Sequence, residues 1–350
     1  MPYEWKVAPE ELFVERYRQM VSSGLPAEDV DAVRSAVTEM WPDRPGGWVH
    51  EWSRLAAGYA EGKRHQLAAL AYGWAKFPTL ANDARRTALQ RQLEQYLLAV
   101  PGFQVAFERR VLQAPHGSGT TPVPVHLLTP PAWAGGTPVM LASGGVDTWK
   151  MDFHGLFEAI ALRTGMPVLA FDIPGTGESE LPMTSEGGAD VVRALAAEAR
   201  TLGNGRVIHL GISMGAHFSA RAGLAADVDA AVVLGGPVEA AFEQSRSFAY
   251  GMDGIVCNAL GFDHDPSAAE RAGSWPSFNL RALLDRDVNV PMLVINGADD
   301  VHVPQHDTLV FRGRRDTDVH LLPDTGHCAV SKMPQVLQLL FEWIDRQRSH

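Results

Sequence analysis

The sequence predicts an α/β protein in which a mostly parallel β-sheet is flanked by helices and preceded by an all-helical N-terminal domain. Three observations support this prediction. The first hundred residues carry apolar side chains at helical spacing. From Phe103 onward, short apolar runs alternate with helix-length segments, a pattern typical of parallel sheets that are covered on both faces. One of these runs, 207–210, leads directly into a serine flanked by glycines.

The N-terminal region is predicted to be helical throughout. Apolar side chains between Leu67 and Trp74 recur at positions i, i+3, i+4 and i+7, and a second stripe follows the helix-start signal at Asn82. We expect residues 1–102 to form a separate helical domain. Its many tryptophans and tyrosines are most simply interpreted as the aromatic core of that domain.

Residues 103–350 are predicted to build the sheet. Alternation in 105–111 and 122–128 indicates two strands that are separated by a turn at 115–119. Residues 238–288 are longer than an ordinary crossover and poor in strand signal, so we expect an excursion over the active edge of the sheet. The segment from Val336 to Ile344 is a predicted closing helix. The further strand-like runs are 138–142, 167–171, 207–210, 230–234, 291–295 and 319–322.

The composition is that of a globular protein. Of 350 residues, 46% are hydrophobic and 20% are charged, and the net charge of −11 argues against binding a nucleic-acid backbone. No stretch approaches the about 18 uninterrupted apolar residues of a membrane span. Cys257 and Cys328 give neither a disulfide framework nor metal-ligand spacing. Because the N-terminus also lacks the order of a signal peptide, a cytoplasmic location is the expectation.

The most informative motif is Gly211-Ile212-Ser213-Met214-Gly215. It joins a buried-type strand to a helix of small residues. Glycines two positions before and after the serine leave the backbone room for a sharp turn that exposes the hydroxyl above the sheet. Ser213 is therefore predicted to be a nucleophile.

A serine nucleophile needs a base, and the base needs a carboxylate to orient it. In a sheet of this kind the three follow the chain order serine, acid, histidine. The strand at 291–295 is followed by Asp299 and Asp300. We prefer Asp300 because the second acid of such a pair commonly caps the following turn. His327 follows the last strand and is the predicted base.

Two other histidines compete with His327. His302 lies on the same turn as the acid and is ranked below His327. His217, on the helix after Ser213, is interpreted as a packed or exposed structural residue.

An oxyanion intermediate requires two backbone donors. We expect one to be the N–H of Met214, directly after the nucleophile. The paired glycines after the strand at 138–142 allow close approach to substrate, and Gly145 is the predicted second donor. The glycines of 172–179 are compatible with phosphate binding, but no P-loop lysine follows them. That segment is therefore interpreted as a structural loop.

Together these motifs resemble the α/β-hydrolase superfamily across residues 105–350. The resemblance rests on Asp-x-Pro-Gly-x-Gly-x-Ser at 172–179, the serine motif, Gly297-x-x-Asp300 and Gly326-His327. The stretch 138–150 is similar to a narrower group, which contains fermentation-respiration switch protein-like esterases, dihydroxypseudooxynicotine hydrolase and fungal polyketide-shortening hydrolases. The N-terminal helical cap of that group resembles residues 1–100 here.

The resemblance implies an α/β-hydrolase fold, with a helical cap at 1–102 and a catalytic domain at 103–350. It also implies that Ser213 is the nucleophile, Asp300 the orienting acid and His327 the base. Four residues are predicted to bind substrate: Asp147, Lys150, Tyr72 and Trp74. For Asp147, a role as a loop cap is an equally good interpretation.

The expected function is serine-dependent hydrolysis of an ester or a β-diketone-like carbon–carbon bond in a bulky, largely apolar small molecule. An alternative is that the same side chains work without water, as an acyltransferase or an elimination lyase in natural-product biosynthesis. A non-catalytic ligand-binding protein is a third. No metal or organic cofactor is implied. The expected partner is a small-molecule substrate, and binding to nucleic acid or to a membrane is not expected. The sequence leaves open whether the protein forms a homodimer.

Overall fold

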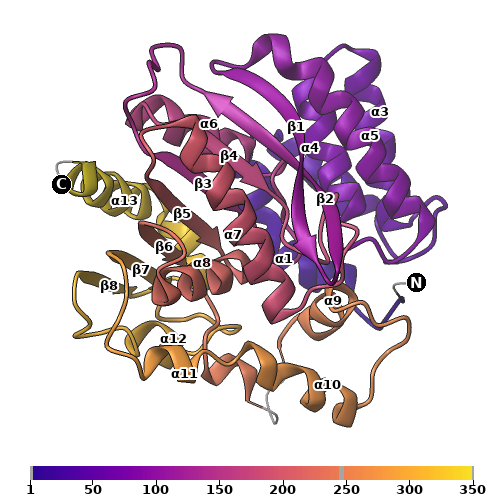
Figure 1. The fold of residues 1–350 in the computed structure, drawn as a ribbon. Coiled ribbons are helices and arrows are strands. Elements are labelled where there is room, and N and C mark those ends of the chain that lie inside the picture. Colours follow the sequence, from indigo (N-terminus) through magenta and orange to yellow (C-terminus); the bar gives the residue numbers. More distant parts are fainter. Residues whose placement is uncertain (1–2, 244–247, 349–350) are drawn as a thin grey trace. The chain divides into compact units, whose positions relative to one another are not determined.

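The computed structural model describes residues 3–243 and 248–348 (Figure 1). The chain divides into two compact units, which we call the helical unit and the sheet unit. The helical unit consists of Met1–Phe103, Met151–Gly155 and Phe248–Pro266. The sheet unit consists of Gln104–Lys150, Leu156–Ser247 and Ser267–His350.

The helical unit is built around tryptophans. Trp48 and Trp52 are completely buried, and their rings pack against each other and against Phe13. The helix that the sequence predicts after Asn82 begins there, and the Asn82 side chain caps it by accepting a hydrogen bond from the N–H of Arg85 at 3.2 Å. The helices of this unit are α1 (Pro9–Ser22), α2 (Ala27–Ala36), α3 (Trp48–Glu61), α4 (His65–Lys76), α5 (Asp83–Ala99) and α9 (Met252–Ala259).

The sheet unit contains one eight-stranded sheet, in the order β1-β2-β4-β3-β5-β6-β7-β8. β1 and β2 form an antiparallel hairpin and β2 is antiparallel to β4, whereas the remaining neighbours are parallel. The strands are β1 (Ala106–His116), β2 (Gly119–Thr129), β3 (Val139–Ser143), β4 (Val168–Phe171), β5 (Val207–Ile212), β6 (Ala230–Leu234), β7 (Met292–Gly297) and β8 (Thr317–Leu322).

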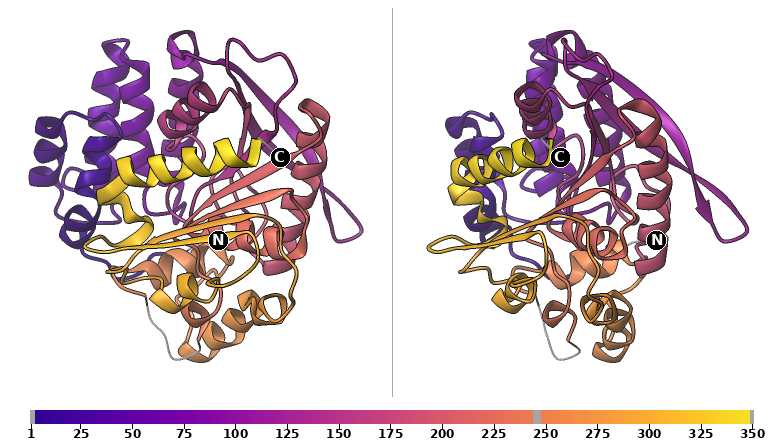
Figure 2. Two further views of the ribbon diagram at one scale, coloured as in Figure 1. Left: turned by 90° about the vertical axis from the view of Figure 1, so that its left-hand side faces the viewer. Right: turned by 60° about the vertical axis from the view of Figure 1, so that its left-hand side comes forward.

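Helices cover both faces of this sheet. Figure 2 shows α7 (Ser185–Leu202) on one face and α13 (Met333–Arg348) on the other. α8 (Met214–Ala225) packs beside α7 against β5 and β6. α6 (His154–Thr164) lies beside α13, since Arg163 pairs with Asp345 at 3.4 Å and its guanidinium lies over the ring of Phe341. Strands β3 to β7 are buried along their whole length, as expected for a parallel sheet between two helical layers.

The predicted fold class is confirmed, with one local difference. The turn expected at 115–119 is shorter, because β1 continues to His116 and β2 begins at Gly119. Gly117 takes the turn with φ of 57°, a conformation that favours glycine.

The segment between β6 and β7 contains no strand among its described residues; residues 244–247 lie outside the description. It holds α9, α10 (Ala268–Ser274) and α11 (Arg281–Leu284), and α12 (Gln305–Leu309) follows β7. That this excursion covers the active edge of the sheet stays a prediction. In the described part of the chain, no helix combines the length and apolar character needed to cross a membrane.

Candidate active site

The sequence around Ser213 folds as a strained turn between β5 and α8. Ser213 has φ of 56° and ψ of −122°, an unusual conformation for a residue with a side chain. The two flanking glycines are sterically required. A Cβ at Gly211 would lie 2.2 Å from the carbonyl oxygen of Gly215, and a Cβ at Gly215 would lie 2.3 Å from that of Gly144. The turn therefore lifts the hydroxyl above the end of the strand.

Three predicted residues meet at this end of the sheet, because β5, β7 and β8 are parallel and their following loops lie at one edge. Ser213 Oγ lies 2.8 Å from His327 Nε2, and His327 Nδ1 lies 2.7 Å from Asp300 Oδ2. A carboxylate only accepts, so Nδ1–H donates to Asp300 and Nε2 is free to accept the Ser213 proton. The result is a continuous chain of hydrogen bonds from hydroxyl to carboxylate.

Asp300 is held on both of its oxygens. Oδ1 accepts from the N–H of His302 at 2.8 Å and of Val303 at 3.1 Å, and Oδ2 accepts from Asn296 Nδ2 at 2.8 Å. Burial alone would raise the pKa of Asp300. The charge of His327 and the hydrogen bonds from His327, Asn296 and the His302 N–H outweigh burial and lower that pKa to about 2. Asp300 is therefore a fixed negative charge at neutral pH.

His327 retains 16% exposure of its side chain, whereas the side chain of Asp300 is 1% exposed. Burial alone would lower the pKa of the imidazole. Neighbouring Cys328 and the Asp300 carboxylate act in the opposite direction, and the net effect raises the pKa of His327 well above its usual 6.5. In its neutral form the imidazole is therefore a stronger base than free histidine, suited to accept a proton from Ser213 and to return it.

The loop after β3 approaches Ser213 closely at Gly145. A Cβ on Gly145 would lie 2.9 Å from Ser213 Cβ and 3.1 Å from its Oγ, so a side chain at this position would collide with the nucleophile. The N–H of Gly145, however, donates to the carbonyl of Thr148 at 3.0 Å. It therefore needs to exchange this partner before it can bind an oxyanion. The oxyanion roles of Gly145 and Met214 stay predictions.

Asp147 and Lys150 lie on the same loop, and both are buried. Asp147 Oδ1 accepts from the hydroxyl of Thr148 at 3.1 Å, in keeping with the loop-cap alternative. The ammonium of Lys150 is fully buried and pairs with Asp172 and, at 2.7 Å, with Glu178. With both carboxylates engaged, Lys150 ties the loop after β3 to the loop after β4. This ion pair gives Lys150 a structural role, and its predicted contact with substrate stays a prediction.

Trp74 belongs to the core of the helical unit. It is 7% exposed, its carbonyl accepts from Trp48 Nε1 at 2.6 Å, and its ring packs against Trp52 and Phe77. Tyr72 is half-buried at the margin of the same core. The predicted pocket-lining role of these two residues is untested, and for Trp74 a packing role is already evident.

Trp74→Ala is therefore expected to lower the free energy of unfolding by about 3–5 kcal/mol, as for other buried tryptophans. Tyr72→Ala should cost less because its side chain is only half-buried. Chemical denaturation of both variants measures this difference. A Trp74→Ala variant of unchanged stability but altered substrate preference would contradict the packing role.

The alternative candidates for the acid and the base lie in different environments from Asp300 and His327. Asp299 is exposed, whereas the carboxylate of Asp300 is buried. His302 stacks edge-on against His327, with ring centroids 5.4 Å apart. His217 is fully buried and donates from Nδ1 to the carbonyl of Pro237 at 3.0 Å, which makes it a packed structural residue.

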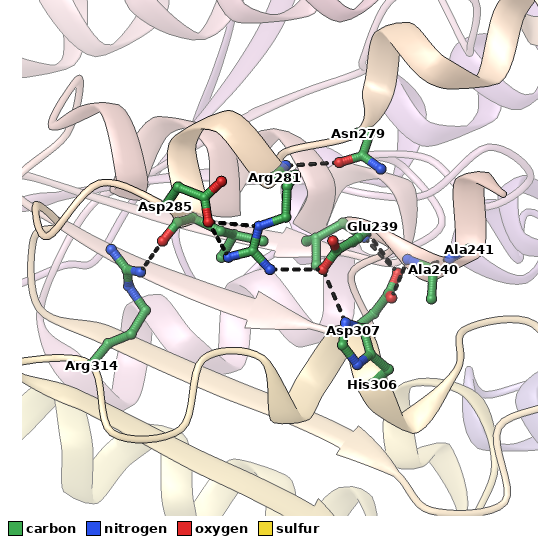
Figure 3. Close-up of polar contacts among 11 residues, drawn as sticks. Glu239, Ala240, Ala241, Asn279, Arg281, Asp285, His306, Asp307 and Arg314 are labelled. Carbon is green, nitrogen blue, oxygen red and sulfur yellow. Dashed lines mark hydrogen bonds and ion pairs between the residues drawn. The ribbon is translucent and has the colours of Figure 1, made fainter.

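The first residues of the excursion, 238–241, are held in place by Asp307, a residue that was not predicted from the sequence (Figure 3). This carboxylate is fully buried on α12. Nearby, Glu239 accepts from Arg281 Nη1 at 3.3 Å and from His306 Nε2 at 2.9 Å. Asp307 and Glu239 thus anchor the chain where it leaves the sheet. Asp307 accepts from the four N–H groups of Val238, Glu239, Ala240 and Ala241, at 2.8, 3.1, 2.7 and 3.2 Å.

Asn296 was also missed. The available signal was a polar residue at the end of the apolar run 291–295, four positions before Asp300.

Among the residues that the structure describes, no group of three or more histidine, cysteine, aspartate or glutamate side chains is arranged to hold a metal ion.

Comparison with known proteins agrees with this fold. A family model described as "Esterase FrsA-like" matches residues 35–348. Esterase FrsA of Photobacterium profundum is 24% identical over 311 residues, which cover 81% of this chain and 72% of that protein. The solved structure of wild-type AbyA5 has a TM-score of 0.77 at 21% identity, over 96% of this chain and 97% of its own. The 2,6-dihydroxy-pseudo-oxynicotine hydrolase has a TM-score of 0.73 at 19% identity, over 93% and 95%. These likenesses confirm the predicted α/β-hydrolase fold.

Proposed function

Since this chain belongs to the FrsA-like esterase family of α/β-hydrolases, we propose that it hydrolyses carboxylic esters of small molecules through Ser213, His327 and Asp300. The observation that carries the proposal is the unbroken hydrogen-bond chain, at 2.8 Å and 2.7 Å, from the serine hydroxyl to a buried carboxylate. This arrangement makes an otherwise weak nucleophile reactive.

The first half of the reaction forms an acyl-enzyme. Ser213 Oγ attacks the ester carbonyl while His327 Nε2 accepts the hydroxyl proton. Asp300 stabilises the resulting imidazolium and keeps its orientation. His327 then gives the proton to the leaving alcohol as the tetrahedral intermediate collapses.

In the second half, water takes the place of the alcohol. His327 accepts a proton from the water, which attacks the acyl carbonyl, and then returns a proton to Ser213 Oγ. We propose the N–H groups of Met214 and Gly145 as the oxyanion donors. For Gly145 this requires that its hydrogen bond to Thr148 breaks when substrate binds.

The substrate proposal follows from the same groups. A base that returns its proton suits an alkoxide leaving group, which ester cleavage produces directly. We propose that the helical unit acts as a cap, that Asp147 supplies a polar contact, and that the ester belongs to a bulky, largely apolar small molecule. Cleavage of a carbon–carbon bond would need, in addition, a leaving group that is stabilised as a carbanion.

Isotope incorporation tests the proposed reaction. With a chromogenic p-nitrophenyl ester in water enriched in oxygen-18, the carboxylic acid produced should carry one heavy oxygen above the background of a Ser213→Ala sample, and p-nitrophenol none. Acyl transfer to an added alcohol would give an unlabelled ester. That product without labelled acid would contradict ester hydrolysis as the function.

A further inference from the structure

Asn296 is a polar side chain at the end of a buried strand. It lies on β7, between Ile295 and Gly297, and is 0% exposed. Burying an amide is costly unless its donors and acceptor find partners. Here the partners come from two different loops of the sheet unit, and both loops carry residues of the proposed site.

One end of the Asn296 amide contacts the acid. Nδ2 donates to Oδ2 of Asp300 at 2.8 Å, and this same oxygen accepts from His327 Nδ1 at 2.7 Å. A hydrogen bond to an ionised carboxylate is stronger than one between neutral groups. Asn296 therefore helps to fix the orientation of the oxygen that orients the imidazole.

The other end holds the backbone directly after His327. Asn296 Oδ1 accepts from the N–H of Cys328 at 3.0 Å. Cys328 and Ala329 have φ of 55° and 49°, in the left-handed region that residues other than glycine rarely adopt. Such backbone persists only where its surroundings hold it in place. The hydrogen bond from Cys328 to Asn296 is one of the contacts that hold this turn.

The two contacts together require an asparagine. With the amide rotated by half a turn, its oxygen would face the Asp300 carboxylate and its NH₂ group would face the Cys328 N–H. Aspartate at this position keeps the acceptor for Cys328 but loses the donor to Asp300. Leucine, of similar size, loses both.

We propose that Asn296 is a positioning residue for ester hydrolysis: it joins the Asp300 loop to the His327 loop and so sets the geometry of the acid and base. This inference rests on the proposed serine-hydrolase function. Loss of Asn296 should slow proton removal from Ser213 and lower kcat, with little effect on KM.

The test is the rate at which a fluorophosphonate reacts with Ser213. The wild type is compared with Asn296→Leu, Asn296→Asp and the control Asn289→Leu. Asn289 precedes the opposite end of β7, where its Nδ2 donates to the carbonyls of Val290 and Arg315 at 2.8 Å each. We expect Asn296→Leu to react about 10- to 100-fold more slowly, the usual effect of a lost hydrogen bond to a charged group. Asn289→Leu should react at the wild-type rate, whatever its melting temperature.

Two further measurements separate positioning from a general structural effect. The far-downfield proton resonance of His327 Nδ1 should shift or broaden in Asn296→Leu and stay unchanged in Asn289→Leu. In Asn296→Asp, the new carboxyl group would face the Asp300 carboxylate. At lower pH the two groups can share one proton, which restores a hydrogen bond between them, whereas at higher pH both are ionised and repel each other. The rate of this variant should therefore fall again as pH rises, a limb that the wild type lacks. The other titratable groups of this cluster, His302, His327 and Cys328, contact Asp300, each other or Asn296 and are present in every variant, so the new limb reports the added carboxylate.

Equal reaction rates in the wild type and Asn296→Leu would overturn the inference while leaving the proposed function standing. If Asn296→Leu shows no cooperative thermal transition, Asn296→Asp decides, because it keeps the shape of the side chain. A wild-type rate without the additional pH limb in Asn296→Asp would then overturn the inference. A wild type that does not react at Ser213 would contradict both the proposed function and the inference.

Discussion

Replacing Ser213 by alanine is expected to reduce kcat for ester hydrolysis by about 10⁶-fold, the scale seen when the nucleophile of a serine hydrolase is removed. The side chain is partly exposed and its hydroxyl bonds to His327. The melting temperature should therefore stay close to that of the wild type. Steady-state kinetics with a chromogenic ester and a thermal unfolding curve measure the two effects.

Ser219→Ala, on the helix that follows Ser213, is the matched control. The Ser219 hydroxyl is fully buried and lies 2.8 Å from the carbonyl oxygen of His209 and 3.0 Å from that of Val232, so its one proton is donated to either of them. Its loss should lower stability by about 1–3 kcal/mol, because buried carbonyls lose a donor, and leave kcat nearly unchanged. A Ser213→Ala enzyme that keeps a tenth or more of the wild-type kcat would contradict the nucleophile assignment.

Asp300→Asn is expected to lower kcat by about 10⁴-fold, as in other enzymes where the orienting carboxylate becomes an amide. The NH₂ group would oppose the Nδ1–H of His327, so the imidazole would move its proton to Nε2. In that tautomer, Nε2 can no longer accept from Ser213. Kinetics with the same ester measures the loss.

The pH dependence of Asp300→Asn gives an independent check. Hydrolysis requires neutral His327, and the Asp300 carboxylate favours the imidazolium, which raises the pKa of His327. Without that charge the pKa falls, so the acidic limb of kcat/KM should move to lower pH. Asp299→Asn, at the exposed neighbouring position, should behave as the wild type. An Asp300→Asn enzyme within tenfold of the wild type would contradict the assignment.

There is a physical reason why the strands and the three residues of the hydrogen-bond chain could be predicted from the sequence. Buried parallel strands need continuous apolar runs, and each run that the sequence shows from 138 to 322 became a strand. Because parallel strands end at one edge, residues that directly follow β5, β7 and β8 had to come together. Ser213, Asp300 and His327 all satisfy that condition.

Other features depend on contacts through space that no local pattern records. The buried ion pair of Lys150 with Asp172 could not be predicted from the sequence, because the two residues are 22 positions apart in the chain. Gly145 lies beside Ser213 as expected, but its N–H is engaged by the turn of its own loop. In the sequence, Asn296 only interrupts an apolar run. Its contacts with the Asp300 and His327 loops become visible only in the folded structure. Trp74 has the same spacing whether it lines a pocket or fills a core.

Identification of the residue that a fluorophosphonate modifies is the most direct test of the central claim. Peptide mapping by mass spectrometry after treatment of the folded wild-type protein should find a single adduct on the peptide that contains Ser213, formed in step with loss of ester hydrolysis and absent from Ser213→Ala. Complete inactivation with the adduct on any other residue, or full modification of Ser213 with hydrolysis intact, would contradict the claim that His327 and Asp300 make this serine the nucleophile.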